Sequence, residues 1–152
     1  MENIDVFRIV LDSENADIST EAQGDFNYDV KLATRRTNYT KYILYVDNFS
    51  ISLKGLTTDS VLLKLNVGQY NSYNSSTGGN NQVVATIFNP NIASARTVDL
   101  ALNHQAPNTP YRISTLPNNL NVKLTNIDNT VINFSNADNF WLLSLRVEAF
   151  YD

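Results

Sequence analysis

Residues 140–151 read FWLLSLRVEAFY and give the clearest indication of the fold. Its apolar side chains return at every second position from Trp141 to Ala149, with polar residues such as Arg146 and Glu148 between them. Side chains on a β-strand point alternately to opposite faces of the sheet. A period of two therefore predicts a strand with one buried face and one exposed face.

The same period of two recurs along the rest of the chain. It predicts eight strands, at residues 4–12, 26–33, 40–54, 60–68, 82–88, 97–102, 119–127 and 140–151. Two further runs, at 111–114 and 131–134, would be edge additions. Turn-forming residues separate the runs, and no segment carries a convincing helical stripe. Because a parallel sheet needs helical crossovers, the pattern predicts an all-β fold, a sandwich or barrel of antiparallel strands.

The more apolar face of each alternating strand is expected to line the core. The expected core residues are Phe7, Ile9, Leu11, Tyr28, Val30, Leu63, Leu65, Val122, Leu124, Trp141, Leu143, Leu145 and Val147. In the run at 40–54 apolar and polar residues occur on both faces, and no core residue is assigned there.

The length and composition of the chain suit one domain spanning residues 1–152. Its net charge of −4 gives it no basic surface, so we expect no nucleic-acid partner. Its longest apolar runs are far too short for a bilayer, and no membrane span is expected. No internal repeat and no interdomain linker is visible.

The residues that carry most enzyme chemistry are scarce. The absence of cysteine excludes thiol catalysis, disulfides and zinc–thiolate sites. The single histidine, His104, lies in a loop-like stretch without a triad signature. Residues 12–17 are rich in oxygen donors but lack the EF-hand spacing, so they are interpreted as a polar turn, with calcium as the alternative. We therefore expect no catalytic residue, no metal and no cofactor.

One low-complexity segment, residues 68–82, reads GQYNSYNSSTGGNNQ. It is longer than a hairpin connection needs, and loops of that length are usually functional or disordered. Tyrosine offers rigid amphipathic contact area and asparagine offers adaptable hydrogen bonds. The segment is therefore predicted to be an interaction loop through Tyr70, Asn71, Tyr73 and Asn74.

Three blocks of sequence carry a resemblance to a known family. They are VFRIVLDS at 6–13, KYILYVDNFSI at 41–51, and the closing pair LNVKLTN at 120–126 and FWLLSLRVE at 140–148. Together they resemble the short single-jelly-roll capsid proteins of large icosahedral double-stranded DNA viruses of algae and protists. The resemblance implies a single jelly roll of two sheets, in which the first and last strands are neighbours.

The resemblance also implies a role. Proteins of this family are pentons or minor capsid proteins of the virion, without enzymatic activity. The implied partners are other capsid proteins, including a major capsid protein, and further copies of the chain, five if it is a penton. Two other classes stay open from the residues alone. One is a carbohydrate- or receptor-binding sandwich, such as a lectin-like module or fibre head, with a glycan as ligand; the other is an enzyme with dispersed carboxylates.

Overall fold

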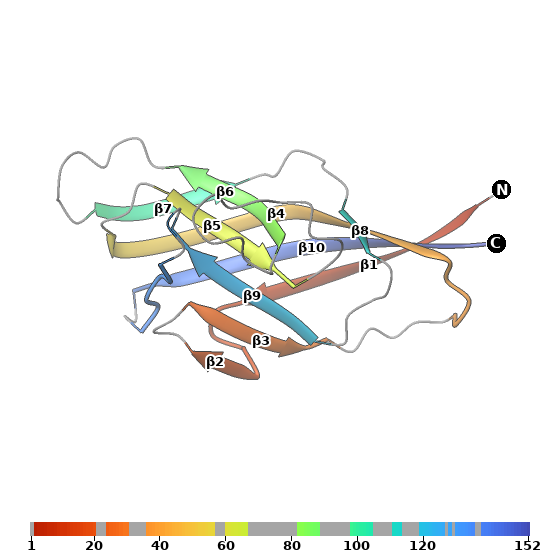
Figure 1. Ribbon diagram of the computed structural model, residues 1–152, viewed down its shortest axis with the longest axis horizontal. Helices are drawn as coiled ribbons and strands as arrows, with labels where there is room; N and C mark the ends of the chain where they lie inside the picture. Colours follow the sequence, from red (N-terminus) through yellow and green to blue (C-terminus); the bar gives the residue numbers. More distant parts are fainter. Residues whose placement is uncertain are drawn as a thin grey trace.

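The computed structural model is a sandwich of two antiparallel β-sheets (Figure 1). It describes residues 2–20, 24–30, 36–56, 60–66, 82–88, 98–104, 111–113, 119–126, 128, 130–135 and 138–152. Within these residues every regular element is a strand. No helix long and apolar enough to cross a membrane occurs in this described part of the chain.

The first sheet, here called sheet A, contains the longest strands. Its order is β1 (Asn3–Asp12), β10 (Phe140–Tyr151), β4 (Lys41–Leu56) and β7 (Val98–His104). The short β8 (Tyr111–Ile113) also pairs with β4. Sheet B has the order β2 (Ile18–Thr20), β3 (Asp25–Asp29), β9 (Asn119–Thr125), β5 (Ser60–Leu65) and β6 (Gln82–Phe88).

The strands pair in a nested order along the chain. β5 pairs with β6, β4 with β7, β3 with β9, and β1 with β10, all antiparallel. The prediction that strand 4–12 lies beside strand 140–151 is therefore confirmed, with Phe7 opposite Val147 and Ile9 opposite Leu145. The two chain ends consequently lie side by side at one end of the molecule (Figure 1).

Several predicted boundaries need correction. β3 ends at Asp29 instead of residue 33, and β9 ends at Thr125 instead of residue 127. The run at 131–134 is not a strand, because only Val131 forms an isolated bridge, to Thr125. β2 was not predicted, since three residues are too few to show a period of two. β8 is the edge addition that the run at 111–114 indicated.

A β-bulge in β4 explains why alternation did not identify the buried face of that strand. Ser144 pairs with Asn48 but the next residue of β10, Leu145, pairs with Val46, so Asp47 is one extra residue. An extra residue shifts the alternation of side chains by one position. The buried residues are accordingly even-numbered before the bulge and odd-numbered after it: Leu44 and Val46, then Phe49, Ile51 and Leu53.

The space between the sheets is filled by one hydrophobic core. Eleven of the thirteen expected core residues are buried, whereas Phe7 and Val30 are only partly buried and pack against it. Trp141 lies at its centre, with the rings of Phe26, Tyr28 and Phe49 at centroid distances of 5.2, 6.1 and 6.5 Å. Aromatic pairs of this geometry add to the stabilisation that burial provides.

Candidate interaction surface

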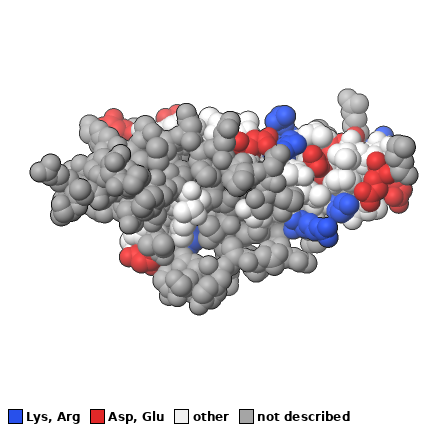
Figure 2. Space-filling view, turned by 90° about the horizontal axis from the view of Figure 1, so that it is seen from above, with Lys and Arg blue, Asp and Glu red and all other residues white. Residues whose placement is uncertain are grey.

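Charged side chains are mixed in sign at the end of the molecule where both termini lie. Figure 2 shows acidic and basic groups next to one another toward this end, in the described part of the side that it presents. Such mixing favours ion pairs within the molecule over a surface of one sign. The charged groups on the outer face of sheet A illustrate this arrangement in detail.

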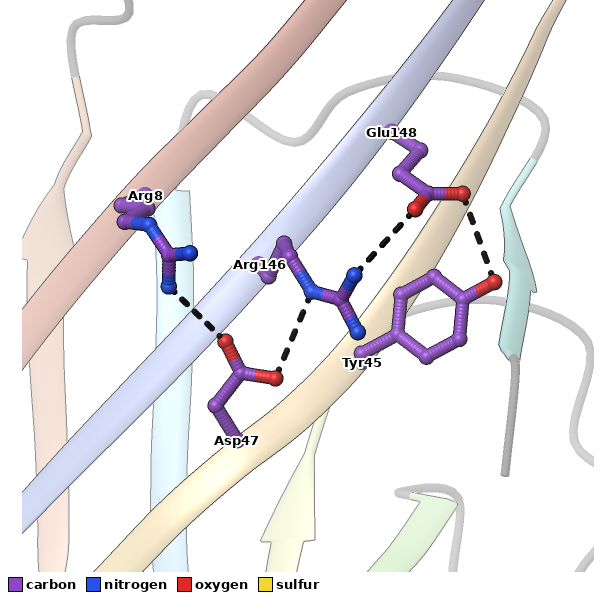
Figure 3. A network of polar contacts seen from close by, with 5 residues as sticks. All are labelled: Arg8, Tyr45, Asp47, Arg146 and Glu148. Atoms are coloured by element: carbon purple, nitrogen blue, oxygen red, sulfur yellow. Dashed lines mark hydrogen bonds and ion pairs between the residues drawn. The ribbon is translucent and has the colours of Figure 1, made fainter. Parts of the chain in front are cut away.

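The extra residue of the bulge, Asp47, is the centre of a polar network (Figure 3). Its Oδ2 lies 3.1 Å from Nη1 of Arg8 on β1, and its Oδ1 lies 3.4 Å from Nε of Arg146 on β10. Nη1 of Arg146 lies 3.3 Å from Oε1 of Glu148, and the Tyr45 hydroxyl donates to Oε2 of Glu148 at 3.3 Å. Three neighbouring strands are thus tied together by five side chains.

The bulge has an electrostatic consequence. Arg8 and Arg146 stand directly opposite each other in the register of β1 and β10. Like charges in that position destabilise a sheet. Because Asp47 contacts both guanidinium groups, its carboxylate offsets their repulsion. The Arg146 guanidinium also lies 4.3 Å from the centroid of the Tyr45 ring.

Tyr45 acts in this network as a neutral hydrogen-bond donor. Burial and the adjacent Glu148 carboxylate raise the pKa of the Tyr45 phenol above its ordinary value. The network therefore pairs two cations with two anions and keeps its phenol protonated. This arrangement suits a structural tie, since each charged group of the network contacts a group of opposite charge on the same or a neighbouring strand.

Next to the network, β1 presents apolar side chains to solvent. Ile4, Val6 and Val10 are 48%, 53% and 62% exposed, and Arg8 lies between them on the same face. We call Ile4, Val6, Arg8 and Val10 the β1 row. β1 is the end strand of sheet A, so this row runs along an edge of the sandwich. Apolar residues gathered at a sheet edge are a feature of docking sites.

A second cluster, the Tyr39 cluster, comprises Asp5, Arg36, Tyr39, Tyr42 and Tyr151. The Tyr39 hydroxyl donates to Asp5 Oδ2 at 2.7 Å, and the Arg36 guanidinium lies 3.8 Å over the Tyr151 ring. The Tyr39 ring packs against those of Tyr42 and Tyr151 at 5.7 and 6.2 Å. Desolvation and the bond to the Asp5 carboxylate raise the pKa of Tyr39 to about 12. The cluster holds the segment before β4 against the chain ends.

On the outer face of sheet B, amide side chains join neighbouring strands. The Asn121 side chain donates to Asp25 Oδ1 and Asn27 Oδ1, both on the neighbouring β3. The Asn121 backbone amide donates to Asn66 Oδ1 at 2.9 Å, and Asn66 Nδ2 donates to the Asn119 carbonyl at 3.1 Å. These amides therefore bind one another across the strands.

The predicted interaction loop stays a prediction. Its residues Tyr70, Asn71, Tyr73 and Asn74 lie outside the residues that the structure describes. His104, expected in a loop, is instead the last residue of β7, opposite Phe49.

The segment after β1 is a polar turn. Asp12 Oδ1 accepts hydrogen bonds from the backbone amides of Glu14 and Asn15, at 2.9 and 2.8 Å. Asp17 Oδ2 accepts a hydrogen bond from the backbone amide of Asp29. These carboxylates thus stabilise the turn and its contact with β3. No group of three potential metal ligands among His, Cys, Asp and Glu occurs in the described residues.

Sequence reasoning missed Asp47 as the organising residue of sheet A. The sequence carries no clear signal of it, because residues 42–46 are apolar at both even and odd positions, so the shift of the buried face is hidden. A search with models of protein families and a search of curated proteins found no match to this chain. Function is therefore inferred from strand pairing and surface chemistry.

Proposed function

We propose that the chain is a single jelly roll and a structural capsid protein, either a penton or a minor capsid component, that acts through subunit assembly. The observation that carries the proposal is the nested strand pairing. A jelly roll has eight strands in two sheets, joined as two Greek keys. With β2 and β8 set aside as edge additions, eight strands remain, four in each sheet.

The way in which the nested pairs are distributed supports this topology. The pairs β1–β10 and β4–β7 belong to sheet A, whereas β3–β9 and β5–β6 belong to sheet B. Successive pairs therefore alternate between the sheets, as they do when one long antiparallel hairpin is rolled up. The contacts β10–β4 and β9–β5 then join the pairs within each sheet.

The surface chemistry supports an assembly role over a catalytic one. The acidic and basic groups around Asp47 are bound to one another across three strands. The exposed apolar residues lie along a sheet edge. A rigid body with apolar and charged contact areas fits a protein that packs against neighbours, and the resemblance of blocks 6–13, 41–51 and 140–148 points to a capsid as the place.

The proposal is tested by mass spectrometry of gradient-purified particles of the virus that would encode this chain. Peptides of this chain should co-purify with the major capsid protein in constant ratio across the particle peak. A non-structural protein of the same virus serves as control for contamination. The proposal fails if the peptides follow the control into the soluble fractions.

A carbohydrate- or receptor-binding role is the second candidate, favoured by the Tyr39 cluster. Three tyrosine rings and Arg36 lie together at one end of the sandwich, each partly accessible. Tyrosine and arginine are frequent in recognition sites. Under this alternative a glycan array gives specific binding that Tyr151→Ala abolishes, whereas Thr86→Ala on β6 leaves it unchanged.

A further inference from the structure

β1 is an unusually long open edge. It pairs with β10 over all ten of its residues, and no strand within the described residues pairs with its other side. Every second residue of such a strand directs its backbone amide and carbonyl away from the sheet. Proteins usually protect an edge of this kind with short strands, lysine, proline or bulges. β1 contains no lysine or proline, and its register with β10 has no interruption.

The side chains of β1 add an apolar driving force to these open backbone groups. Three of the four residues of the β1 row are β-branched aliphatic residues, and each is about half exposed or more. β-branched side chains pack well across a strand pair. The edge therefore offers both the hydrogen-bonding groups and the side chains that an added strand needs.

We propose that a second copy of this chain adds to the edge, with the two β1 strands pairing antiparallel about a two-fold axis at Phe7. A two-fold axis perpendicular to the sheet keeps each side chain on its own face. Two residues that oppose each other across the axis must then lie on the same face, so both have even numbers or both have odd numbers. The axis at Phe7 places Ile4 of one copy opposite Val10 of the other, and Val6 opposite Arg8.

The neighbouring registers are less favourable. An axis at Arg8 places the two Arg8 guanidinium groups directly opposite each other, which destabilises a sheet. An axis at Val6 places Val10 opposite Glu2 and leaves it without an apolar partner. With the axis at Phe7, the aliphatic part of Arg8 covers Val6 while its guanidinium stays with Asp47. The strand is thus complementary to itself.

This inference does not depend on the capsid proposal, because it concerns two copies of the chain in any setting. Analytical ultracentrifugation over a concentration series should give the mass of a dimer that dissociates on dilution. The variant Val6→Lys/Val10→Lys should sediment as a monomer with an unchanged circular dichroism spectrum. Thr86→Lys, an exposed change on β6 of sheet B, is the matched control and should keep the dimer.

Cross-linking tests the register, since the wild-type chain has no cysteine. Ile4→Cys/Val10→Cys should form a dimer under mild oxidation. The two thiols of one copy cannot meet, because six strand residues separate them by about 20 Å. The control Ile4→Cys/Arg8→Cys matches the axis at Val6 and should stay largely monomeric.

Three outcomes would overturn the inference. They are a monomeric wild type at every concentration, an oligomer that survives Val6→Lys/Val10→Lys, and cross-linking of the control pair in place of the predicted pair. A pentamer that survives the lysine substitutions would contradict the proposed β1 contact and leave the capsid proposal intact. Absence of the chain from virus particles would contradict the capsid proposal and leave the proposed β1 contact intact.

Discussion

The two sheets end differently on the side where β1 and β2 lie (Figure 1). Sheet A ends in β1, which is ten residues long and exposes Ile4, Val6 and Val10. Sheet B ends in β2, which has only three residues and covers part of β3. Short edge strands offer few free backbone groups to another chain. On this side, sheet B therefore offers fewer free backbone groups to an added strand than sheet A does.

The outer faces of the two sheets also differ in the kind of interaction that joins their strands. Sheet A is tied by ion pairs around Asp47, whereas sheet B is tied by neutral and charged acceptors around Asn121. Salt screens exposed ion pairs but affects amide hydrogen bonds much less. The two sheets thus share one core but differ in the interactions that hold their outer surfaces together.

The largest effect is expected in the shared core. Leu145 on sheet A and Leu124 on sheet B are both fully buried. Replacing either by Ala should lower the free energy of unfolding by about 2–5 kcal/mol, through lost burial and a residual cavity. Urea denaturation measures both variants. Similar costs would support one common core, and a value near zero for either would mean that its sheet does not contribute to that core.

A second large effect is expected at Gly24, which directly precedes β3 of sheet B. Its φ is 54°, and an added Cβ would lie 2.6 Å from the Ile132 carbonyl oxygen and 2.8 Å from that of Leu124. Both atoms belong to the backbone and cannot move aside cheaply. Gly24→Ala should therefore cost about 1–3 kcal/mol. A melting temperature equal to that of the wild type would contradict this close approach.

Asn121→Ala should have an intermediate effect on sheet B. It removes hydrogen bonds to Asp25 and Asn27 and should cost about 1 kcal/mol. Because the donor is a neutral amide, the cost should be nearly the same at low and high salt. Thermal unfolding at two ionic strengths measures it, and a cost that vanishes in salt would mean that sheet B does not differ from sheet A.

Arg8→Met should have a smaller effect on sheet A. The Arg8 side chain is 67% exposed, and its ion pair with Asp47 should contribute about 0–1 kcal/mol. Loss of the repulsion from Arg146 should reduce the cost further. Whatever cost appears at low salt should shrink at high salt, in contrast to Asn121→Ala. A cost that is large and independent of salt would show that packing, not charge, holds this position.

The smallest effect should appear only at alkaline pH, at the Tyr39 cluster. Folding raises the pKa of Tyr39 from 10.0 to about 12, by desolvation and by its bond to Asp5. A raised pKa stabilises the fold fully below pH 10, and this stabilisation is lost as the pH rises toward 12. The stability difference between the wild type and Tyr39→Phe should therefore narrow between pH 10 and 12. A constant difference would contradict the shift.

Much of this architecture could be predicted from alternation alone. The period of two at 140–151 identified the buried face of β10, from Trp141 to Val147, and all of those alternate residues are buried. Alternation failed at β4, because the bulge at Asp47 changes the buried parity within one strand. It also failed at β2, which is a strand only because β3 lies beside it.

Alternation in the sequence predicts most of the strands and, in most of them, which face is buried. Both properties are local, since backbone geometry sends successive side chains to opposite faces. The contacts among Arg8, Asp47 and Arg146, and the position of the apolar residues of β1 at a sheet edge, follow from the tertiary structure alone. Those features depend on strand pairing between residues far apart in the chain, and no local pattern encodes which strand lacks a neighbour.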